Sequence, residues 1–193
     1  MSRTFVVALL GAESTGKTTL AAGIGAALST RGLQVTLVTE VLREFCIEYG
    51  RTPRQDEQVG IAREQTRRID SAAKDAGIVV ADTTALMIAA YSDLVFADTG
   101  LYALAEAEQV RIDLTLLTAL DLPWQADGLQ RDGAHVQRPV DALVRAALER
   151  AGVPFDIVSG SGPSRLASAL ASIDRALAAR RRAPPAGDAS GRS

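Results

Sequence analysis

The stretch Gly-Ala-Glu-Ser-Thr-Gly-Lys-Thr at residues 11–18 determines how the rest of this chain is interpreted. An apolar run at residues 4–10 precedes it, and a helix-forming stretch at residues 19–28 follows it. In this order, strand, glycine-rich turn and helix are the context in which G-x-x-x-x-G-K-T forms a phosphate-binding loop. Glycines let backbone N–H groups wrap closely around anionic oxygens, and the helix N-terminus adds about half a positive charge. We therefore expect this segment to hold a nucleotide by its phosphates.

The types of residue in the loop indicate what each would do. Lys17 is one of only two lysines among 21 basic residues, and its compact charge suits the β- and γ-phosphates. The Thr18 hydroxyl is of the kind that ligates Mg²⁺ beside such a loop. The alternative is a glycine-rich turn that holds no ligand. The predicted nucleotide-binding residues are Gly11, Ala12, Glu13, Ser14, Thr15, Gly16, Lys17, Thr18 and Thr19.

Composition narrows the class of protein. A chain of 193 residues, 47% of them hydrophobic, is long enough to bury a real core, and its net charge of −2 provides no field that would attract nucleic acid or an anionic membrane. Cys46 and His135 are each the only residue of their type, so we expect neither an internal disulfide nor a Cys/His metal site. We expect neither a leader segment nor a membrane-spanning helix, and therefore a cytoplasmic protein that contacts neither nucleic acid nor membrane.

Apolar runs and helix-forming stretches alternate along the chain, which predicts an α/β fold. We expect a P-loop NTPase of the nucleoside- and nucleotide-kinase type, with a five-stranded, mostly parallel sheet flanked by helices. One domain is expected over residues 1–180, with a disordered, arginine-containing tail at residues 181–193. Strands are predicted at residues 4–10, 34–39, 78–82, 111–118 and 155–158, helices at 19–28, 41–49, 54–76, 83–95, 101–109, 139–151 and 164–180, and a loop at 122–137.

Residues just past each strand are the functional candidates, because ligands of open parallel sheets bind beyond the carboxyl ends of the strands. Asp82 ends the third strand and suits Mg²⁺, although it could instead cap the helix that follows. Glu40 ends the second strand, where it could take a proton from a substrate hydroxyl or simply lie favourably at a helix N-terminus. With Lys17, these two carboxylates are predicted to be catalytic.

The segment that follows the fourth strand mixes arginines with glycines. We expect a lid at about residues 123–138, in which Arg131 and Arg138 neutralise charge on the transferring phosphoryl group. A plain solvated loop is the alternative. Trp124, at the start of this segment, either stacks on a substrate ring or anchors the lid in the core.

Five short motifs together resemble the nicotinamide-riboside kinase domain. That domain occurs in the bifunctional NadR regulator of NAD synthesis and in stand-alone proteins labelled AAA-family or NadR-like ATPases. The similarity runs from about Phe5 to Leu177. The family pattern Asp-Gly-x-Arg places an arginine where this chain has Gln130, and Arg131 comes one residue later. The motifs are residues 11–19, Glu40-Val-Leu-Arg43, Val80-Ala-Asp-Thr-Thr84, Pro123-Trp-Gln-Ala-Asp-Gly128 and Ser159-Gly-Ser-Gly-Pro-Ser-Arg165.

The resemblance implies ATP-dependent phosphorylation of the ribose 5′-hydroxyl of nicotinamide riboside, a step in NAD salvage. It implies that residues 11–19 bind ATP and that Thr18 and Asp82 bind Mg²⁺. A homodimer is expected only by analogy. A kinase for another nucleoside or metabolite, and a regulatory ATPase or nucleotide switch without a small-molecule substrate, remain open alternatives. The implied substrate-binding residues are Glu40, Arg43, Trp124 and Asp127.

Overall fold

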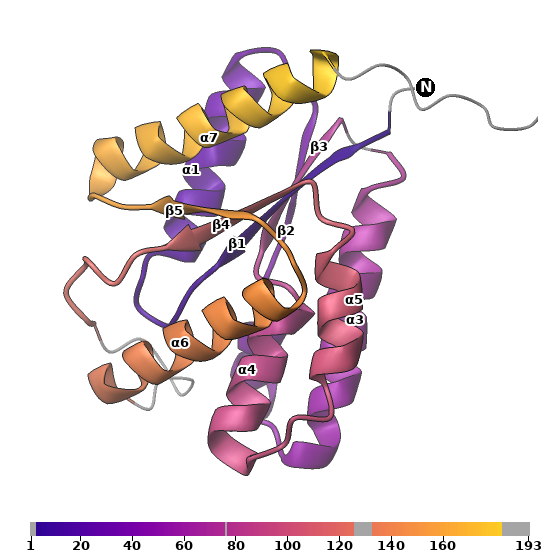
Figure 1. Ribbon diagram of the computed structural model, residues 1–193, viewed down its shortest axis with the longest axis vertical. Coiled ribbons are helices and arrows are strands. Elements are labelled where there is room, and N and C mark those ends of the chain that lie inside the picture. Colours follow the sequence, from indigo (N-terminus) through magenta and orange to yellow (C-terminus); the bar gives the residue numbers. More distant parts are fainter. Residues whose placement is uncertain (1–2, 76, 126–132, 183–193) are drawn as a thin grey trace, which may run out of the picture.

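The computed structural model describes residues 3–75, 77–125 and 133–182, and the account below concerns those ranges. Within them, five strands alternate with seven helices (Figure 1). Every strand and helix that the sequence predicts is present. In chain order they are β1 (Phe5–Leu10), α1 (Lys17–Thr30), β2 (Val35–Val38), α2 (Val41–Tyr49), α3 (Gln55–Ala72), β3 (Ile78–Asp82), α4 (Ala85–Phe96), α5 (Tyr102–Gln109), β4 (Leu114–Thr118), α6 (Ala134–Arg150), β5 (Phe155–Val158) and α7 (Gly162–Arg182).

The five strands form one sheet in the order β2-β3-β1-β4-β5, and each neighbouring pair is parallel. Strand order reverses at β1, which has β3 on one side and β4 on the other. The register sets Leu9 of β1 opposite Asp82 of β3, so the segments that follow these two strands meet at the same edge of the sheet. This is the place where ligands bind in doubly wound α/β sheets. The predicted fold class is confirmed.

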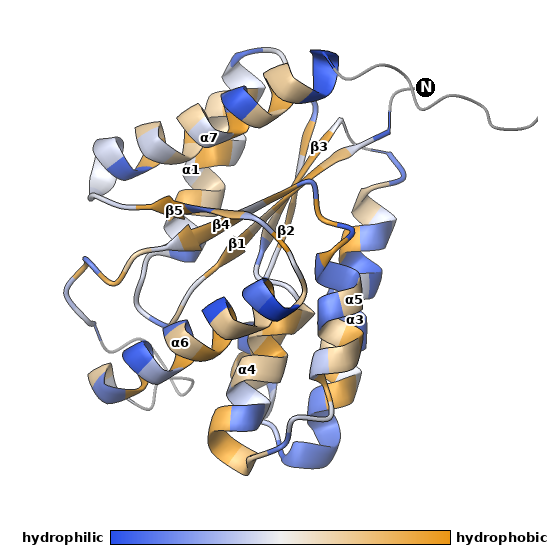
Figure 2. Ribbon diagram, viewed as in Figure 1, coloured by the Kyte–Doolittle hydropathy of each residue, from blue (hydrophilic) through white to orange (hydrophobic). Residues whose placement is uncertain are grey.

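Helices cover both faces of the sheet (Figure 1). α1 and α7 pack on one face, and α3, α4, α5 and α6 pack on the other. Side chains of β1 alternate accordingly: Phe5, Val7 and Leu9 face α1 and α7, whereas Val6 and Leu10 face the opposite layer. All of β1 is buried, which explains its unbroken apolar sequence. Figure 2 shows the largely hydrophobic strands between helices in which hydrophilic and hydrophobic residues are mixed.

The sixth helix begins earlier than its proline suggests. We expected Pro139 in the first turn of a helix at residues 139–151, but α6 starts at Ala134 and contains Pro139 in its interior. Residues 134–137, expected as loop, are therefore helical. Proline removes one backbone donor near the start of α6, and burial of Val136 and Val140 on one face compensates for this loss.

Other predicted boundaries also differ from those of the structure; for example, α3 ends at Ala72 rather than at residue 76. The fourth strand begins at Leu114 rather than at Arg111, because turn hydrogen bonds from Arg111 and Ile112 back to α5 occupy the residues before it. α7 continues to Arg182, so Arg181 and Arg182 are helical and do not belong to a disordered tail. The remainder of the predicted tail, residues 183–193, lies outside the described residues.

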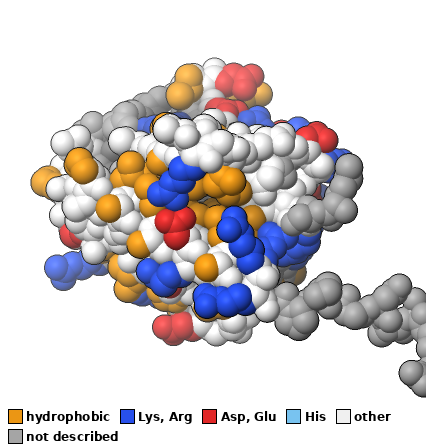
Figure 3. Space-filling model, turned by 90° about the horizontal axis from the view of Figure 1, so that it is seen from above, with side chains coloured by type: hydrophobic (Ala, Val, Ile, Leu, Met, Phe, Trp, Pro, Cys, Tyr) orange, Lys and Arg blue, Asp and Glu red, His pale blue; other side chains and the backbone are white. Residues whose placement is uncertain are grey.

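Surface charge on the described part of the chain is mixed. On the face shown in Figure 3, basic and acidic side chains are interspersed with hydrophobic ones, in keeping with a net charge of −2. A helix long and apolar enough to cross a membrane does not occur within the described ranges.

Candidate active site

The phosphate loop at residues 11–18 joins β1 to α1 and depends on glycine at both ends. Gly11 has φ +144°, and a Cβ placed there would lie 2.0 Å from Thr118 Oγ1. Gly16 has φ +76° and directly precedes α1. Ser14 also adopts a left-handed conformation, with φ +58°, which is uncommon for a residue with a side chain. Left-handed residues of this kind concentrate at ligand-binding loops, where the surrounding structure holds them in place.

Side chains of neighbouring elements hold the loop in this shape. Thr15 Oγ1 donates to Ala12 O at 2.7 Å, and Thr118 Oγ1, at the end of β4, lies 2.7 Å from Thr15 Oγ1. The Lys17 ammonium donates to Ala12 O at 2.9 Å. These contacts position the backbone N–H groups of the loop before any anion binds, which lowers the cost of binding one.

Asp82 lies beside the loop in the position predicted for a metal-binding carboxylate. It is 4% exposed, and its Oδ2 accepts a hydrogen bond from Thr18 Oγ1 at 2.5 Å. Its Oδ1 is buried and has no hydrogen-bond partner among the described residues. The alternative role of helix cap belongs to Thr84, whose Oγ1 accepts from Leu86 N at 3.2 Å.

These two side chains fit Mg²⁺. A hydroxyl and a carboxylate in contact, with one buried carboxylate oxygen unsatisfied, are the oxygen ligands that Mg²⁺ prefers. The described ranges contain no group of three or more His, Cys, Asp or Glu side chains that could hold a metal by themselves. A magnesium ion held by Thr18 and Asp82 would therefore complete its coordination with water and phosphate oxygens, as is usual for this ion.

A cavity of about 200 Å³ adjoins the loop. Its charged lining residues are Glu13, Lys17, Glu40 and Arg43. Glu40 directly precedes α2 and its side chain makes no capping hydrogen bond, while Arg43 Nη1 lies 3.4 Å from Thr18 Oγ1. The cavity continues along α4, where its lining is largely hydrophobic and aromatic: Met87, Tyr91, Val95 and Phe96.

Glu13 connects the phosphate loop to the segment that was predicted to form a lid. Its carboxylate is 7% exposed, and Oε1 accepts from Trp124 Nε1 at 3.1 Å and from Gly133 N at 3.2 Å. Gln137 Nε2 donates to the Glu13 backbone oxygen at 2.8 Å. Glu13 thus joins the phosphate loop to both ends of the 124–133 connection and to the first turn of α6.

We expect Glu13→Ala to release the Trp124 indole into water, because the charged acceptor of its N–H is lost. Hydrogen bonds to a charged group contribute about 1.5–3 kcal/mol. Because these bonds hold the phosphate loop to the 124–133 connection, their loss should weaken ATP binding by about ten-fold or more. Trp124 is the only tryptophan, and its fluorescence spectrum measures the change directly. Glu13→Gln keeps an acceptor and should retain most of the wild-type spectrum. Identical spectra for the wild type and the alanine variant would contradict this role.

Arg165 is a buried side chain that contacts the phosphate loop and the segments after β4 and β5. Although it is charged, its side chain is only 4% exposed, and its guanidinium donates to Thr15 O at 2.9 Å and to Asp121 Oδ1 at 2.7 Å. It also donates to the backbone oxygens of Ala119 and Gly160. Burial alone would raise the pKa of Asp121, but the Gly160 N–H and the Arg165 guanidinium hold that pKa below its ordinary value. Arg165 therefore joins the ends of β4 and β5 to the loop.

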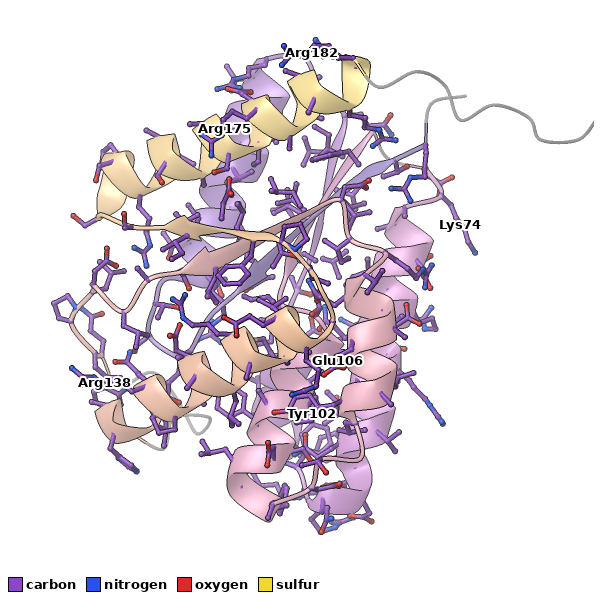
Figure 4. The ribbon with its side chains drawn as sticks, in the orientation of Figure 1. Lys74, Tyr102, Glu106, Arg138, Arg175 and Arg182 are labelled. Atoms are coloured by element: carbon purple, nitrogen blue, oxygen red, sulfur yellow. The ribbon has the colours of Figure 1, made fainter. Side chains whose placement is uncertain are left out.

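The structure brings some of the predicted site residues together and separates others. Lys17, Thr18, Glu40 and Arg43 line one cavity, and Asp82 touches Thr18. Arg138 is exposed on α6 (Figure 4) and, with Trp124, does not belong to the described lining of that cavity. Asp127 and Arg131 lie outside the described residues. Sequence reasoning did not single out Gln58 or Tyr91, which line the cavity, and it quoted Arg165 in a motif without assigning it a role.

The start of α3 is fixed beside the cavity by an ion pair. Arg51 Nη1 and Nη2 donate to the two carboxylate oxygens of Glu57 at 2.7 Å each, and Arg54 N donates to Glu57 Oε2 at 2.8 Å. Thr52 and Pro53, which lie between these arginines, line the cavity. The hydrogen bonds from Arg51 and then from Arg54 lower the pKa of Glu57 to about 2.

We expect Glu57→Gln to destabilise the protein in a pH-dependent way. Because the folded-state pKa is lowered, the ionised carboxylate contributes its stability above the unfolded-state pKa, and this contribution disappears as the pH falls toward about 2. The difference in urea midpoint between variant and wild type should be largest above about pH 5 and should shrink on acidification. Glu48→Gln, on the exposed side of α2, is the matched control. A difference that does not vary with pH would contradict the ion pair's role.

Residues 6–165 match the protein family described as AAA domain. No curated protein matches the sequence. Solved structures that are similar in fold include two NadR complexes and a thymidylate kinase. The NadR protein in complex with NR is 18% identical with a TM-score of 0.73, over 89% of this chain and 50% of that chain. The NadR protein in complex with NAD and AMP-PNP is 18% identical with a TM-score of 0.72, over 91% of this chain and 50% of that chain. Thymidylate kinase from Ehrlichia chaffeensis is 14% identical with a TM-score of 0.62, over 90% of this chain and 99% of that chain.

This chain spans about half the length of the NadR chains that it matches. At these identities the likeness concerns the fold, which is that of P-loop kinases, and at this level the resemblance to NadR that the motifs predict is confirmed. The family match begins within β1, includes the phosphate loop and Asp82, and ends at Arg165. Because it covers most of the sequence and all five strands of the sheet, the chain belongs to this family of AAA-domain P-loop proteins.

Proposed function

We propose that the protein transfers the γ-phosphoryl group of ATP to the ribose 5′-hydroxyl of nicotinamide riboside and forms nicotinamide mononucleotide. The observation that carries this proposal is the continuity between the phosphate loop and a cavity whose lining changes from charged to hydrophobic and aromatic. A nucleoside has matching parts, a sugar hydroxyl at one end and a flat ring at the other. A NadR protein of the same fold was solved in complex with NR, which supports this choice of substrate.

The proposed reaction assigns steps to Lys17 and Glu40, two of the charged residues that line the cavity. The ribose oxygen forms a bond to the γ-phosphorus while the bond from that phosphorus to the β–γ bridging oxygen breaks, and ADP leaves. Lys17 and the loop N–H groups stabilise charge on the phosphate oxygens. Glu40 holds the attacking hydroxyl in line and accepts its proton. Mg²⁺ bound by Thr18 and Asp82 would supply further positive charge to the β- and γ-phosphates.

Arg43 and Trp124 receive more limited roles in this proposal. Arg43 lies one helical turn from Glu40 and lines the cavity, so it is placed to bind the ribose or the new 5′-phosphate. Trp124 donates to Glu13 and does not belong to the described cavity lining, so we assign it to support of the loop rather than to ring stacking. The charge-neutralising roles of Arg131 and Arg138 stay predictions.

An assay of ADP release with Mg²⁺-ATP tests the proposal directly. Nicotinamide riboside should stimulate ADP release, and mass spectrometry should find the mononucleotide in equal amount. ADP release that does not respond to any nucleoside would contradict phosphoryl transfer and favour a regulatory ATPase or nucleotide switch. Omission of Mg²⁺ in the same assay tests the metal requirement.

Arg43 also supports a second candidate function. A guanidinium in the charged part of the cavity suits a substrate that already carries a phosphate, because it can bind phosphate oxygens in a bidentate manner. The protein would then phosphorylate a nucleoside monophosphate or another phosphorylated metabolite. A higher kcat/KM for a monophosphate than for nicotinamide riboside in the same assay would establish this second candidate in place of the first.

A further inference from the structure

Gln58 is a buried amide in the cavity whose carbonyl oxygen is unsatisfied. It lies in the first part of α3, is 5% exposed and lines the cavity. Its Oε1 is buried and accepts no hydrogen bond from the described residues. A buried amide oxygen without a donor lowers stability, and such groups in native proteins usually serve a ligand or a bound water.

A second glutamine on the same helix shows what a structural amide looks like here. Gln65 lies two turns further along the same face of α3 and is fully buried. Its Oε1 accepts from Val41 N at 2.9 Å, and its Nε2 donates to Thr39 O at 3.2 Å, so both ends of the amide are satisfied. Gln65 closes the junction between β2 and α2, whereas Gln58 faces a cavity.

The position of Gln58 along the cavity follows from these contacts. Because Gln65 binds the end of β2, it marks the part of α3 nearest the carboxyl edge of the sheet. At the start of α3, Gln55 Nε2 donates to Asp98 Oδ2 just beyond α4, at 3.2 Å. Gln58 therefore lies toward the far end of α4, about 10 Å along the helix from Gln65. This is the part of the cavity remote from the phosphate loop, where a substrate ring would lie.

We propose that Gln58 determines substrate specificity by pairing with an uncharged edge of the ring that carries a hydrogen-bond donor beside an acceptor. This inference rests on the proposed function and specifies its substrate class. A primary amide has both a donor and an acceptor, so it can form two parallel hydrogen bonds with a second amide. The carboxamide of nicotinamide has such an edge, and so does the imide of a uracil ring.

The same geometry excludes a carboxylate at this position. A carboxylate only accepts hydrogen bonds, so one of the two bonds to the Gln58 amide would be lost. The described lining residues nearest to Gln58 in sequence, Thr52 and Pro53, and those at the end of α4, Val95 and Phe96, carry no charge to compensate it. Sites built to bind one polar group reject its mismatched analogue strongly, because the buried partner is left unpaired.

Gln58→Met tests the inference, because methionine matches glutamine in length and lacks its polar atoms. Binding is measured by calorimetry without ATP, for nicotinamide riboside, nicotinic acid riboside and uridine, alongside kcat/KM for each. The wild type should bind the amide at least 100-fold more tightly than the acid. Gln58→Met should weaken amide binding by about 10–100-fold and remove most of this selectivity. Gln55→Met, on the exposed start of the same helix, should change neither.

Thermal unfolding separates a ligand-binding amide from a structural one. The Tm of Gln58→Met should equal or exceed that of the wild type, because the substitution removes an unsatisfied buried oxygen. A structural glutamine would lower Tm instead. If Gln58→Met does not fold, Gln58→Glu supplies the second test, because it keeps the shape of the side chain and one acceptor. This variant should bind nicotinamide riboside more weakly than the wild type does, and nicotinic acid riboside more weakly still.

The outcomes separate the inference from the proposed function. If the wild type phosphorylates nicotinamide riboside and a folded Gln58→Met keeps the amide-over-acid selectivity, the inference fails and the function stands. If the wild type binds and phosphorylates no nucleoside, the function fails and the inference fails with it. If the wild type binds uridine more tightly than nicotinamide riboside and Gln58→Met loses this binding, recognition by Gln58 is supported. The ring that Gln58 recognises is then a pyrimidine base.

Discussion

Lys17→Ala is expected to lower kcat for phosphoryl transfer by about 10³-fold while nucleoside affinity changes by less than about two-fold. The ammonium lies at the phosphate loop, 2.9 Å from Ala12 O, and lines the same cavity as Glu40. Charge on the transferring phosphoryl group and the departing ADP is greatest during the reaction, so the loss falls on kcat more than on binding. Alanine also leaves the fold intact, because Lys17 is only partly buried at the first position of α1.

The chain provides a matched control for this substitution. Lys74 is the only other lysine, and it is exposed in the turn after α3, on the opposite side of the molecule from Arg138 in Figure 4. Lys74→Ala should leave kcat and KM unchanged. Steady-state rates for both variants, with nucleoside binding by calorimetry, complete the test. A Lys17→Ala enzyme that retains a tenth or more of the wild-type kcat would contradict phosphate binding by this residue.

The sequence predicted best those parts of the site that depend on local pattern. The phosphate loop was recognisable because glycine spacing, a preceding apolar run and a following helix are all contiguous in the chain. Asp82 was recognisable because a short apolar run ended in a carboxylate, and the register opposite Leu9 then placed it at the loop. Because parallel sheets align the carboxyl ends of their strands, Asp82 could be predicted as a site residue without knowledge of the strand order.

The parts that were missed depend on packing between distant segments. The buried role of Arg165 requires β4, β5 and the phosphate loop to be assembled, since its acceptors include Thr15 and Ala119. Gln58 lies on a helix that appears uniformly polar. Its signal was nevertheless present, because Gln58, Ile61, Ala62, Gln65 and Ile69 follow the spacing of a buried helical face. A glutamine on such a face is either satisfied by the backbone or available to a ligand, and only the structure distinguishes these cases.

The start of α6 follows a periodic apolar pattern rather than the local preference for proline at the first helical position. Proline at the first helical position is favoured, which placed the start at Pro139. Val136, Val140 and Val144 recur every four residues, however, and this apolar stripe predicts a helix that begins one turn earlier. Gly133, with φ +111°, lies directly before α6. The consequence for the site is that Gln137, bound to the Glu13 backbone, belongs to a helix and not to a loop.

Asp82→Asn is expected to lower kcat by about 10²–10³-fold and to abolish the effect of Mg²⁺ on ADP affinity. Asparagine keeps the size of the side chain and can still accept a hydrogen bond from the Thr18 hydroxyl, so the geometry of the loop is retained. What it loses is the negative charge and the second carboxylate oxygen, Oδ1, which is buried and has no partner among the described residues. A divalent cation depends on that charge far more than on the shape of the site.

Two measurements distinguish this role from a structural one. Calorimetry of ADP with and without Mg²⁺ should show a gain in affinity for the wild type that the variant lacks, whereas nucleoside affinity should be the same in both. The Tm should remain unchanged or rise, since removing the charge from a carboxylate that is 4% exposed relieves a desolvation cost. Asp75→Asn, exposed beyond α3, is the control. A variant whose ADP affinity still responds to Mg²⁺ as in the wild type would exclude Asp82 as a metal-binding residue. Thr18 and the phosphates would then be left to hold the ion without a protein carboxylate from β3.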